Sequence, residues 1–193
     1  MRTVVFASSN AGKIKELQAL LGEGWLVKSA QDFPEIPEVD EDADTFEGNS
    51  AKKARTFAKA TGLWALADDS GLVVDALDGR PGVYSARYAP TEPERIEKLL
   101  AELQDVPGGK RTARFVCVLC LASPAGEEFF TRGTCEGVIG LTRKGTHGFG
   151  YDPIFQLPNG STMSELTRDE KSALSHRGHA FRAMLPALIA AGA

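Results

Sequence analysis

The sequence predicts an α/β protein with a mixed β-sheet. The N-terminal part has the pattern of a strand followed by a helix, the middle has the pattern of consecutive strands, and a helical pattern closes the chain. The chain has 193 residues, 42% of them hydrophobic and 25% charged, which is typical of a globular protein. At this length we expect one domain spanning residues 1–193.

The first elements alternate between strand and helix. Residues 3–8 are apolar and β-branched and predict a strand, and a small-residue turn follows at 9–12. Apolar residues then recur at helical spacing: Ile14, Leu17, Leu20 and Leu21. Residues 25–28 predict a second strand, and an acidic, proline-containing loop follows. Asp44 or Thr45 caps the next predicted helix, which ends near Gly62 and has Ala51, Ala54, Phe57 and Ala58 as its apolar stripe.

Strands dominate the second half until the closing helix. Residues 64–67 predict a buried strand, which acidic residues interrupt before the apolar pattern resumes at 72–74. Thr91 with Glu94 forms a capping box ahead of an amphipathic helix. Residues 111–122, 128–132 and 134–141 predict three strands of an antiparallel meander. Thr167 with Glu170 predicts the start of one long helix, with these residues facing inward despite Pro186: Leu174, Phe181, Met184, Leu185, Leu188 and Ile189.

Charge and composition exclude several function classes. Lys and Arg number 22 against 26 Asp and Glu, so the net charge is −4, and no basic cluster exists to bind a nucleic acid polymer. The longest apolar run, 115–122, is far shorter than the ~20 residues that span a bilayer, so we expect no membrane association. The odd set of Cys117, Cys120 and Cys135 indicates reduced thiols and a cytoplasmic protein. Cys117 and Cys120 lie three apart on a strand, so their thiols point to opposite faces and belong to the core.

The first candidate site is the turn between the first strand and the first helix. It comprises Ser8, Ser9, Asn10, Ala11, Gly12 and Lys13. Free N–H groups and the dipole at a helix N-terminus favour an anion, and the lysine adds a positive charge. The Walker A spacing is missing. The alternative is a capped helix start with a solvent-exposed lysine.

Carboxylates form the second candidate site. Asp68 and Asp69 come directly after an apolar strand, and neighbouring strand residues point to opposite faces, so one of them is expected to face a site. An Asx-type turn is the alternative. The acidic loop around Glu41 is by itself an ordinary solvated loop, but together with Asp69 it would complete a site for Mg²⁺.

Two C-terminal segments are suited to a flat, polar ligand. In residues 147–153, glycines flank Phe149, which offers a stacking face, while Tyr151 and Asp152 offer polar edges; a glycine-rich β-bulge is the alternative. Near the start of the last helix, Lys171, His176 and Arg177 are suited to phosphate and to the polar edge of a base. The alternatives there are a His176–His179 metal pair or a solvated helix end.

Taken together, six segments resemble the inosine/xanthosine triphosphate pyrophosphatase family, which removes non-canonical purines from the nucleotide pool. The resemblance spans nearly the whole chain in order. It rests on Ser8-Ser9-Asn10 with Lys13, Thr45-Phe46 with Asn49, residues 67–72 (ADDSGL), residues 81–87 (PGVYSAR), residues 149–153 (FGYDP) and residues 175–178 (SHRG).

The resemblance implies a homodimeric, cytoplasmic, Mg²⁺-dependent enzyme. Its long central mixed sheet would be flanked by helices, with two lobes and the active-site cleft between them. It would cut between the α- and β-phosphates of ITP, dITP and XTP, giving the monophosphate and pyrophosphate. A related pyrophosphatase for modified pyrimidine or methylated nucleotides, and a nucleotide-binding module without turnover, are the competing interpretations.

The resemblance also implies roles for individual residues. The turn at 8–13 with Lys53 and Lys171 would hold the triphosphate, and Glu41 with Asp69 would bind Mg²⁺. Asp69 would be the proton acceptor that activates water, and Ser70 would lie beside it and touch substrate. Phe149, Gly150, Tyr151 and Asp152 would stack on and frame the base, while His176 and Arg177 would donate to the purine 6-oxo group. The 6-amino group of adenine is a donor and would be rejected there.

Overall fold

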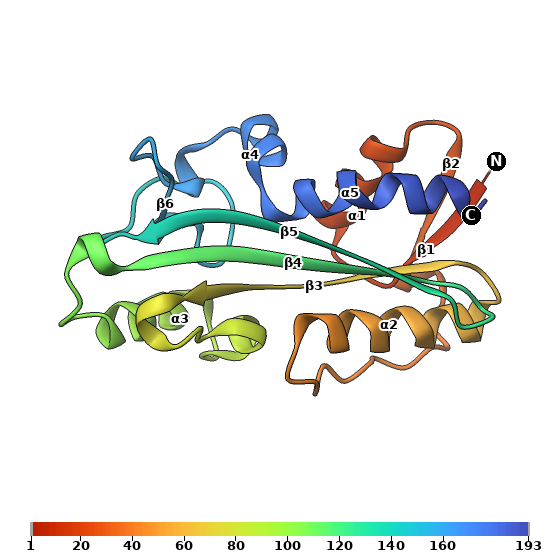
Figure 1. Ribbon diagram of the computed structural model, residues 1–193, viewed down its shortest axis with the longest axis horizontal. Helices are drawn as coiled ribbons and strands as arrows, with labels where there is room; N and C mark the ends of the chain where they lie inside the picture. Colours follow the sequence, from red (N-terminus) through yellow and green to blue (C-terminus); the bar gives the residue numbers. More distant parts are fainter. Residues whose placement is uncertain (1, 193) are drawn as a thin grey trace. The chain divides into compact units, whose positions relative to one another are not determined.

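A mixed six-stranded sheet organises residues 2–192, which are the residues that the computed structural model describes (Figure 1). The strand order is β2-β1-β3-β4-β5-β6. The strands are β1 (Arg2–Phe6), β2 (Trp25–Ser29), β3 (Ala65–Val74), β4 (Thr112–Ala122), β5 (Glu128–Ile139) and β6 (Phe155–Gln156). β1 pairs in parallel with β2 and β3, whereas β5 and β6 are antiparallel. The predicted α/β class with a mixed sheet is therefore confirmed.

Within residues 2–192 there are five α-helices, and three of them begin at the predicted caps. The five are α1 (Ala11–Leu21), α2 (Phe46–Thr61), α3 (Glu92–Glu102), α4 (Arg168–Leu174) and α5 (His176–Ala190). Thr45 caps α2, and complete capping boxes at Thr91 and Thr167 start α3 and α4, because each hydroxyl accepts a backbone N–H that the first turn leaves unpaired. No helix within residues 2–192 is long and apolar enough to cross a membrane.

The chain divides into two compact units. Unit 1 contains the described parts of residues 1–69, 117–133 and 177–193, and unit 2 contains residues 70–116 and 134–176. β3, β4 and β5 each contribute residues to both units. Each unit has its own apolar core.

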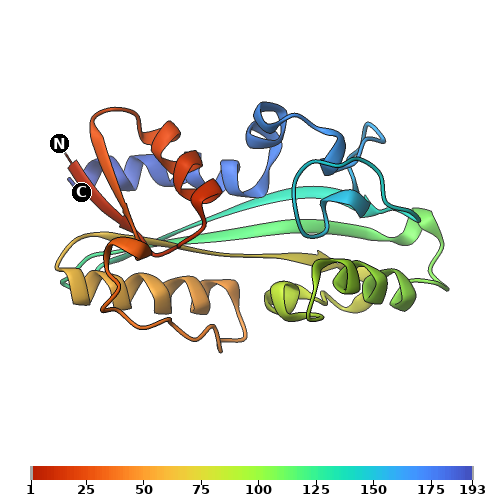
Figure 2. The same ribbon diagram turned by 180° about the vertical axis from the view of Figure 1, so that it is seen from behind.

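Unit 1 has three layers, with helices on both faces of its strands (Figures 1 and 2). Val4 and Phe6 of β1 point to the face covered by α1 and α5, where the rings of Phe6 and Phe181 lie 5.8 Å apart. The alternate residue, Val5, faces α2. The alanine-rich stripe of α2 is buried there as predicted: Ala51, Ala54, Phe57 and Ala58.

The cysteines follow the same alternation. Cys117 belongs to the core beneath α1 and α5, whereas Cys120 belongs to the core beneath α2. Both are buried thiols outside any disulfide, as is Cys135. The prediction that the C-x-x-C thiols diverge is confirmed, because strand residues an odd number apart point to opposite faces.

Unit 2 packs α3 against its strand segments. Ile96 and Leu99 of α3 lie in one cluster with Leu72 and Val74 of β3, and the cluster includes Leu103, which caps the end of α3. The cluster continues through these residues: Phe115, Cys135, Ile139, Tyr151, Ile154 and Phe155. The loop that precedes β6 is thus anchored through its apolar side chains to the core of unit 2.

Three predicted boundaries are wrong. β3 is continuous, so Asp68 and Asp69 lie inside a strand and not in a turn after it. β5 runs through Gly133, which merges two predicted strands into one. The predicted long closing helix is two helices, because the backbone is extended at Ser175 (φ −70°, ψ 148°). Leu174 and Ile189 are 48% and 55% exposed, so they do not face inward as predicted.

Candidate active site

Two consecutive carboxylates in β3 form the polar centre of unit 1. Asp68 is 2% exposed and Asp69 is 6% exposed. Because neighbouring strand residues point to opposite faces, Asp68 faces α1 and α5, whereas Asp69 faces α2. The prediction that the two acids diverge is confirmed, and both have polar partners.

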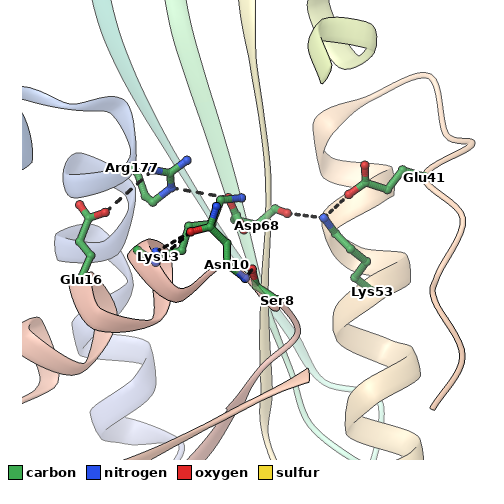
Figure 3. A network of polar contacts seen from close by, with 9 residues as sticks. Ser8, Asn10, Lys13, Glu16, Glu41, Lys53, Asp68 and Arg177 are labelled. Carbon is green, nitrogen blue, oxygen red and sulfur yellow. Dashed lines mark hydrogen bonds and ion pairs between the residues drawn. The ribbon is translucent and has the colours of Figure 1, made fainter. Parts of the chain in front are cut away.

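Asp68 is surrounded by positive charge (Figure 3). Its Oδ2 accepts a hydrogen bond from Lys13 Nζ at 2.7 Å, and Arg177 Nε lies 3.7 Å from the same oxygen. On the other side, Lys53 Nζ donates to the backbone carbonyl of Asp68 at 2.5 Å. Burial by itself raises the pKa of Asp68, but these three cations outweigh it and hold the pKa far below its ordinary value. Asp68 is therefore ionised at neutral pH.

Asp69 has the opposite electrostatic environment. Burial raises its pKa to about 6, and the nearby charges of Glu41 and Asp68 act in the same direction. A hydrogen bond from Asn49 Nδ2 to Asp69 Oδ2, 2.9 Å long, and the charge of Lys53 oppose the rise. A carboxylate with a pKa near 6 is suited to accept a proton close to neutral pH.

The acidic loop is bound to α2. Lys53 Nζ, which contacts the Asp68 carbonyl, also donates to Glu41 Oε1 (Figure 3). Burial lowers the pKa of Lys53, but the charges of Asp68 and Glu41 outweigh it and raise the pKa above its ordinary value. Because Lys53 belongs to α2, the helix that Asp69 faces, Glu41 lies on the Asp69 side of the strand. The alternative of an ordinary solvated loop does not describe Glu41.

The turn before α1 is ordered by its own side chains. Asn10 Oδ1 accepts the N–H groups of Gly12 at 2.9 Å and Lys13 at 3.1 Å, and Ser8 Oγ accepts the N–H of Asn10 at 3.2 Å. Ser9, Asn10, Ala11 and Gly12 are exposed. The alternative of a capped helix start is half correct, because the cap exists but the Lys13 ammonium is held by Asp68 instead of extending into solvent.

In unit 2, the glycine-spaced loop folds around Asp152. Asp152 Oδ2 accepts the N–H of Phe149 at 2.9 Å and is ion-paired with Lys171, whose Nζ lies 4.8 Å from the centre of the Phe149 ring. The Phe149 side chain is 56% exposed, so its ring has a free area for stacking. Gly148 has φ +83°, and a Cβ there would lie 2.1 Å from Asp152 Oδ2, so only glycine fits.

The neighbours of this loop are also held. The Tyr151 hydroxyl donates to the carbonyl of Ser85 at 2.9 Å within the core, and burial raises its pKa. The N–H of Gly150 donates to the carboxylate of Glu92 at the start of α3. The polar edge of Tyr151 is thus used inside the protein, whereas Asp152 and Lys171 form the polar part of the loop.

Of the remaining predicted residues, Ser70 and His176 lie in unit 2, whereas His179 lies in unit 1. Ser70 follows Asp69 in β3 and is partly exposed. The His176 ring is 8% exposed and stacks on Phe115, with ring centres 5.0 Å apart. His179 is exposed, whereas His176 is buried. Among residues 2–192, no group of three or more His, Cys, Asp and Glu side chains is placed to hold a metal ion, so the histidine-pair alternative gains no support.

The predicted site residues fall into two groups. Unit 1 brings together the turn at 8–13, Glu41, Lys53, Asp69 and Arg177. Unit 2 brings together Phe149, Gly150, Tyr151, Asp152 and Lys171, and it also contains Ser70 and His176.

Sequence reasoning did not assign a role to three residues of these groups. Asp68 was one of two equivalent acids, and only contacts with Lys13 and Arg177 from distant parts of the chain distinguish it. Asn49 had a signal, because it is a polar residue one turn before Lys53 on the same face of α2. Glu92 had none beyond its place in the first turn of α3.

The fold and these groups define an α/β protein with a buried acidic pair, lysines converging on it and an exposed aromatic loop. The comparison with known proteins is more specific. The chain belongs to the Ham1 family, whose family model matches residues 4–187. The resemblance inferred from the six segments is confirmed.

Relatives match the chain over nearly its full length. A dITP/XTP pyrophosphatase from Shouchella clausii is 51% identical over 95% of this chain and 95% of that protein, and one from Geobacter sulfurreducens is 51% identical over 93% of each. Among solved structures, a HAM1 protein from Coxiella burnetii has a TM-score of 0.92 and 41% identity, covering 98% of this chain and 100% of that one. A nucleoside-triphosphatase, dITP/XTP pyrophosphatase, from Mycobacterium abscessus has a TM-score of 0.80 and 45% identity, covering 95% and 99%.

Proposed function

We propose that this protein hydrolyses the non-canonical purine nucleoside triphosphates ITP, dITP and XTP to the monophosphate and pyrophosphate. The names of relatives that are about half identical over more than nine-tenths of both chains support the substrate class. The observation that carries the chemistry is Asp69, a carboxylate buried in a strand whose pKa is raised to about 6, within a centre that contains Lys53 and Glu41.

Asp69 acts as the general base. Attack on the α-phosphorus requires a water molecule to lose a proton, and a base is most effective when its pKa lies close to the working pH. Asp69 meets this requirement because burial raises its pKa to about 6, whereas the neighbouring Asp68 carboxylate is tied to Lys13 and Arg177 and has its pKa lowered. Of the two acids, only Asp69 is poised to take up a proton.

Lys13 and Lys53 neutralise the triphosphate. Phosphoryl transfer depends on stabilising negative charge on the phosphate oxygens and on the departing pyrophosphate. Both ammonium groups lie at the acidic pair, Lys13 at the start of α1 and Lys53 on α2. The exposed turn at 8–12 contributes a helix N-terminus, at which an anion is favoured.

Glu41 and Asp69 are the proposed Mg²⁺ ligands. Mg²⁺ binds through one or two carboxylates and completes its octahedron with water and phosphate oxygens, so an all-oxygen pair fits it without a third protein ligand. Lys53 holds Glu41 on the side of the strand that Asp69 faces, which supports this pairing. When bound, the ion would neutralise charge on the phosphates.

Residues of the exposed aromatic loop select the base. Phe149 stacks on the purine, and Asp152 with Lys171 frames it; the contacts of Lys171 with Asp152 and Phe149 support a role beside the base more than beside the triphosphate. His176 and Arg177 donate to the 6-oxo group. An adenine 6-amino group would leave these donors unpaired, a mismatch that discriminates by as much as ~10⁴–10⁵.

The proposal extends to the whole protein. Residues 1–193 act as one nucleoside-triphosphate pyrophosphatase domain, because the family model covers 4–187 and three strands contribute to both units. We further propose that the protein is a homodimer and is located in the cytoplasm. The buried cysteines, none of which is in a disulfide, support a reducing compartment.

The test is pyrophosphate release from ITP, XTP, GTP and ATP, measured in parallel with Mg²⁺ and with a chelator. Metal-dependent release from ITP and XTP, with little from ATP, is expected. Binding without release would favour a nucleotide sensor and refute the hydrolase. Equal release from ITP and ATP would leave the phosphate chemistry intact but refute the proposed base recognition.

A further inference from the structure

We infer that Asn49 is a positioning residue, which orients the Asp69 carboxylate and fixes it relative to the acidic loop that carries Glu41. This inference rests on the proposed roles of Asp69 and Glu41. Asn49 is 1% exposed and lies in the first turn of α2, where its side chain makes two hydrogen bonds to segments on either side of it in the sequence.

The two hydrogen bonds determine which way the amide points. Asn49 Oδ1 accepts the backbone N–H of Ala43 at 2.9 Å, and Asn49 Nδ2 donates to Asp69 Oδ2 at 2.9 Å. A flipped amide would present its NH₂ group to the N–H of Ala43, a donor facing a donor, and its oxygen to the carboxylate. The bond to Ala43 therefore guarantees that Asp69 receives a donor.

The loop that contains Ala43 is packed tightly against the start of α2. A Cβ on Gly48 would lie 2.7 Å from the Cβ of Ala43, so the helix and the loop approach as closely as a glycine allows. Asn49 connects this loop to β3, because it bonds to Ala43 in the loop and to Asp69 in the strand. One turn further along α2, Lys53 makes a second connection, because it bonds to Glu41 in the loop and to the Asp68 carbonyl in the strand. The two proposed metal ligands are thus held by two cross-links from one helix.

The position of the donor has a consequence for catalysis. Asn49 donates to Oδ2 of Asp69, so the amide fixes the orientation in which the carboxylate meets a water molecule or a metal ion. Without the amide, the carboxylate would rotate about its last side-chain bond and the loop would lose its anchor. Residues that orient a ligand in this way typically contribute 10–100-fold to metal affinity or activity.

The two bonds of Asn49 are separable by mutation. Asn49→Asp keeps an oxygen for the N–H of Ala43 but replaces the donor to Asp69 with a second carboxylate, and Asn49→Ala removes both bonds. We expect kcat for ITP to fall about 10–100-fold in both variants, with KM changed by less than about threefold, because the triphosphate contacts of Lys13 and Lys53 remain. The Kd for Mn²⁺, measured by calorimetry without nucleotide, should rise at least about tenfold in Asn49→Ala.

Ser50→Ala is the matched control. Ser50 is the next residue, is fully buried, and its hydroxyl donates only to the carbonyl of Glu47 within α2. The Ser50→Ala substitution perturbs the same helix turn without changing a bond to Asp69, so the kcat and Mn²⁺ affinity of this variant should match the wild type. Circular dichroism of each variant confirms that the measured chains are folded.

Three results would overturn the inference. One is wild-type kcat in folded Asn49→Ala and Asn49→Asp. A second is a loss of kcat/KM that comes entirely from a higher KM. A third is a fall in kcat in Ser50→Ala as large as that in the Asn49 variants, which would indicate a structural effect of the helix turn. The proposed function fails separately, if the wild type releases no pyrophosphate from ITP or if Asp69→Asn retains full turnover.

Discussion

Asp69→Asn is expected to make the metal-free protein more stable at about pH 8. Ionised Asp69 is buried at 6% exposure, and burial raises its pKa to about 6 from an ordinary value of 3.8. A group that binds its proton more tightly in the folded than in the unfolded state opposes folding once the proton is gone. Asparagine has nearly the same shape, carries no charge, and still accepts the hydrogen bond from Asn49 through its oxygen.

The size of the gain follows from the difference in pKa. From 3.8 to about 6 is a free-energy difference of about 3 kcal/mol at pH values well above 6. Near pH 4.5 the folded protein keeps most of its proton, so the gain shrinks to about 1 kcal/mol, and it vanishes below about pH 3.8. In a chain of this length, about 3 kcal/mol corresponds to a Tm increase of roughly 6–12 °C.

Asp68→Asn makes the same chemical change at the next residue and should have the opposite effect. The pKa of Asp68 is lowered because the cations around it outweigh burial, so its charge stabilises the fold at every pH above its ordinary value and is lost only as the pH falls below that value. Removing it leaves the Lys13 ammonium without its carboxylate and leaves Arg177 with Glu16, 3.9 Å away. The expected loss is about 3 kcal/mol or more at about pH 8, since breaking a buried ion pair leaves uncompensated charge.

Thermal unfolding with a chelator present, at about pH 8 and pH 4.5, measures both effects. Asp69→Asn should have a higher Tm than the wild type and Asp68→Asn a lower one, and the Tm gain of Asp69→Asn should be smaller at pH 4.5 than at pH 8. A destabilised Asp69→Asn at pH 8 would refute this expectation. So would a gain that is equal at both pH values, because the charge of Asp69 would then not be its cause.

Three further predictions concern unit 2. Gly148→Ala places a Cβ against Asp152, so the KM for ITP should rise at least about tenfold in steady-state kinetics. Tyr151→Phe leaves the buried carbonyl of Ser85 without its donor, and guanidinium unfolding should show a loss of about 1–3 kcal/mol. Thr91→Ala removes the N-cap of α3 and should cost about 1 kcal/mol in the same measurement, with activity unchanged.

The sequence predicts the elements of this fold better than their continuity. Apolar runs locate the strands and capping boxes locate α3 and α4, because these signals are local. The break predicted in β3 is wrong. Acidic residues disfavour a buried strand when their charge has no partner, but a strand accepts them when nearby cations neutralise that charge. Asp68 is compensated by Lys13 and Arg177, which come from the two ends of the chain, and no local pattern contains that information.

The candidate site was predictable as a set of residues but not as a set of contacts. The resemblance and the residue chemistry both point to Asp69, Glu41 and Lys53, and the structure brings these three together in unit 1. The link between Asp152 and Lys171 was not predictable, because it depends on a loop conformation with positive φ at Gly148. Pairing across 19 residues requires knowledge of the path of that loop.

The consecutive acids of β3 need opposite electrostatic environments, and strand geometry provides them. A phosphate-binding centre must gather cations, yet a lysine or arginine paired directly with the Asp69 carboxylate would lower its pKa in the metal-free protein. Side chains alternate along a strand, so Lys13 and Arg177 meet Asp68 on one face while Asp69 lies on the other. Lys53 reaches the centre by donating to the backbone carbonyl of Asp68 and to Glu41, and its charge lowers the pKa of Asp69 less than burial raises it. Burial therefore dominates at Asp69, and its pKa stays near 6 although the positive charges of the centre are close by.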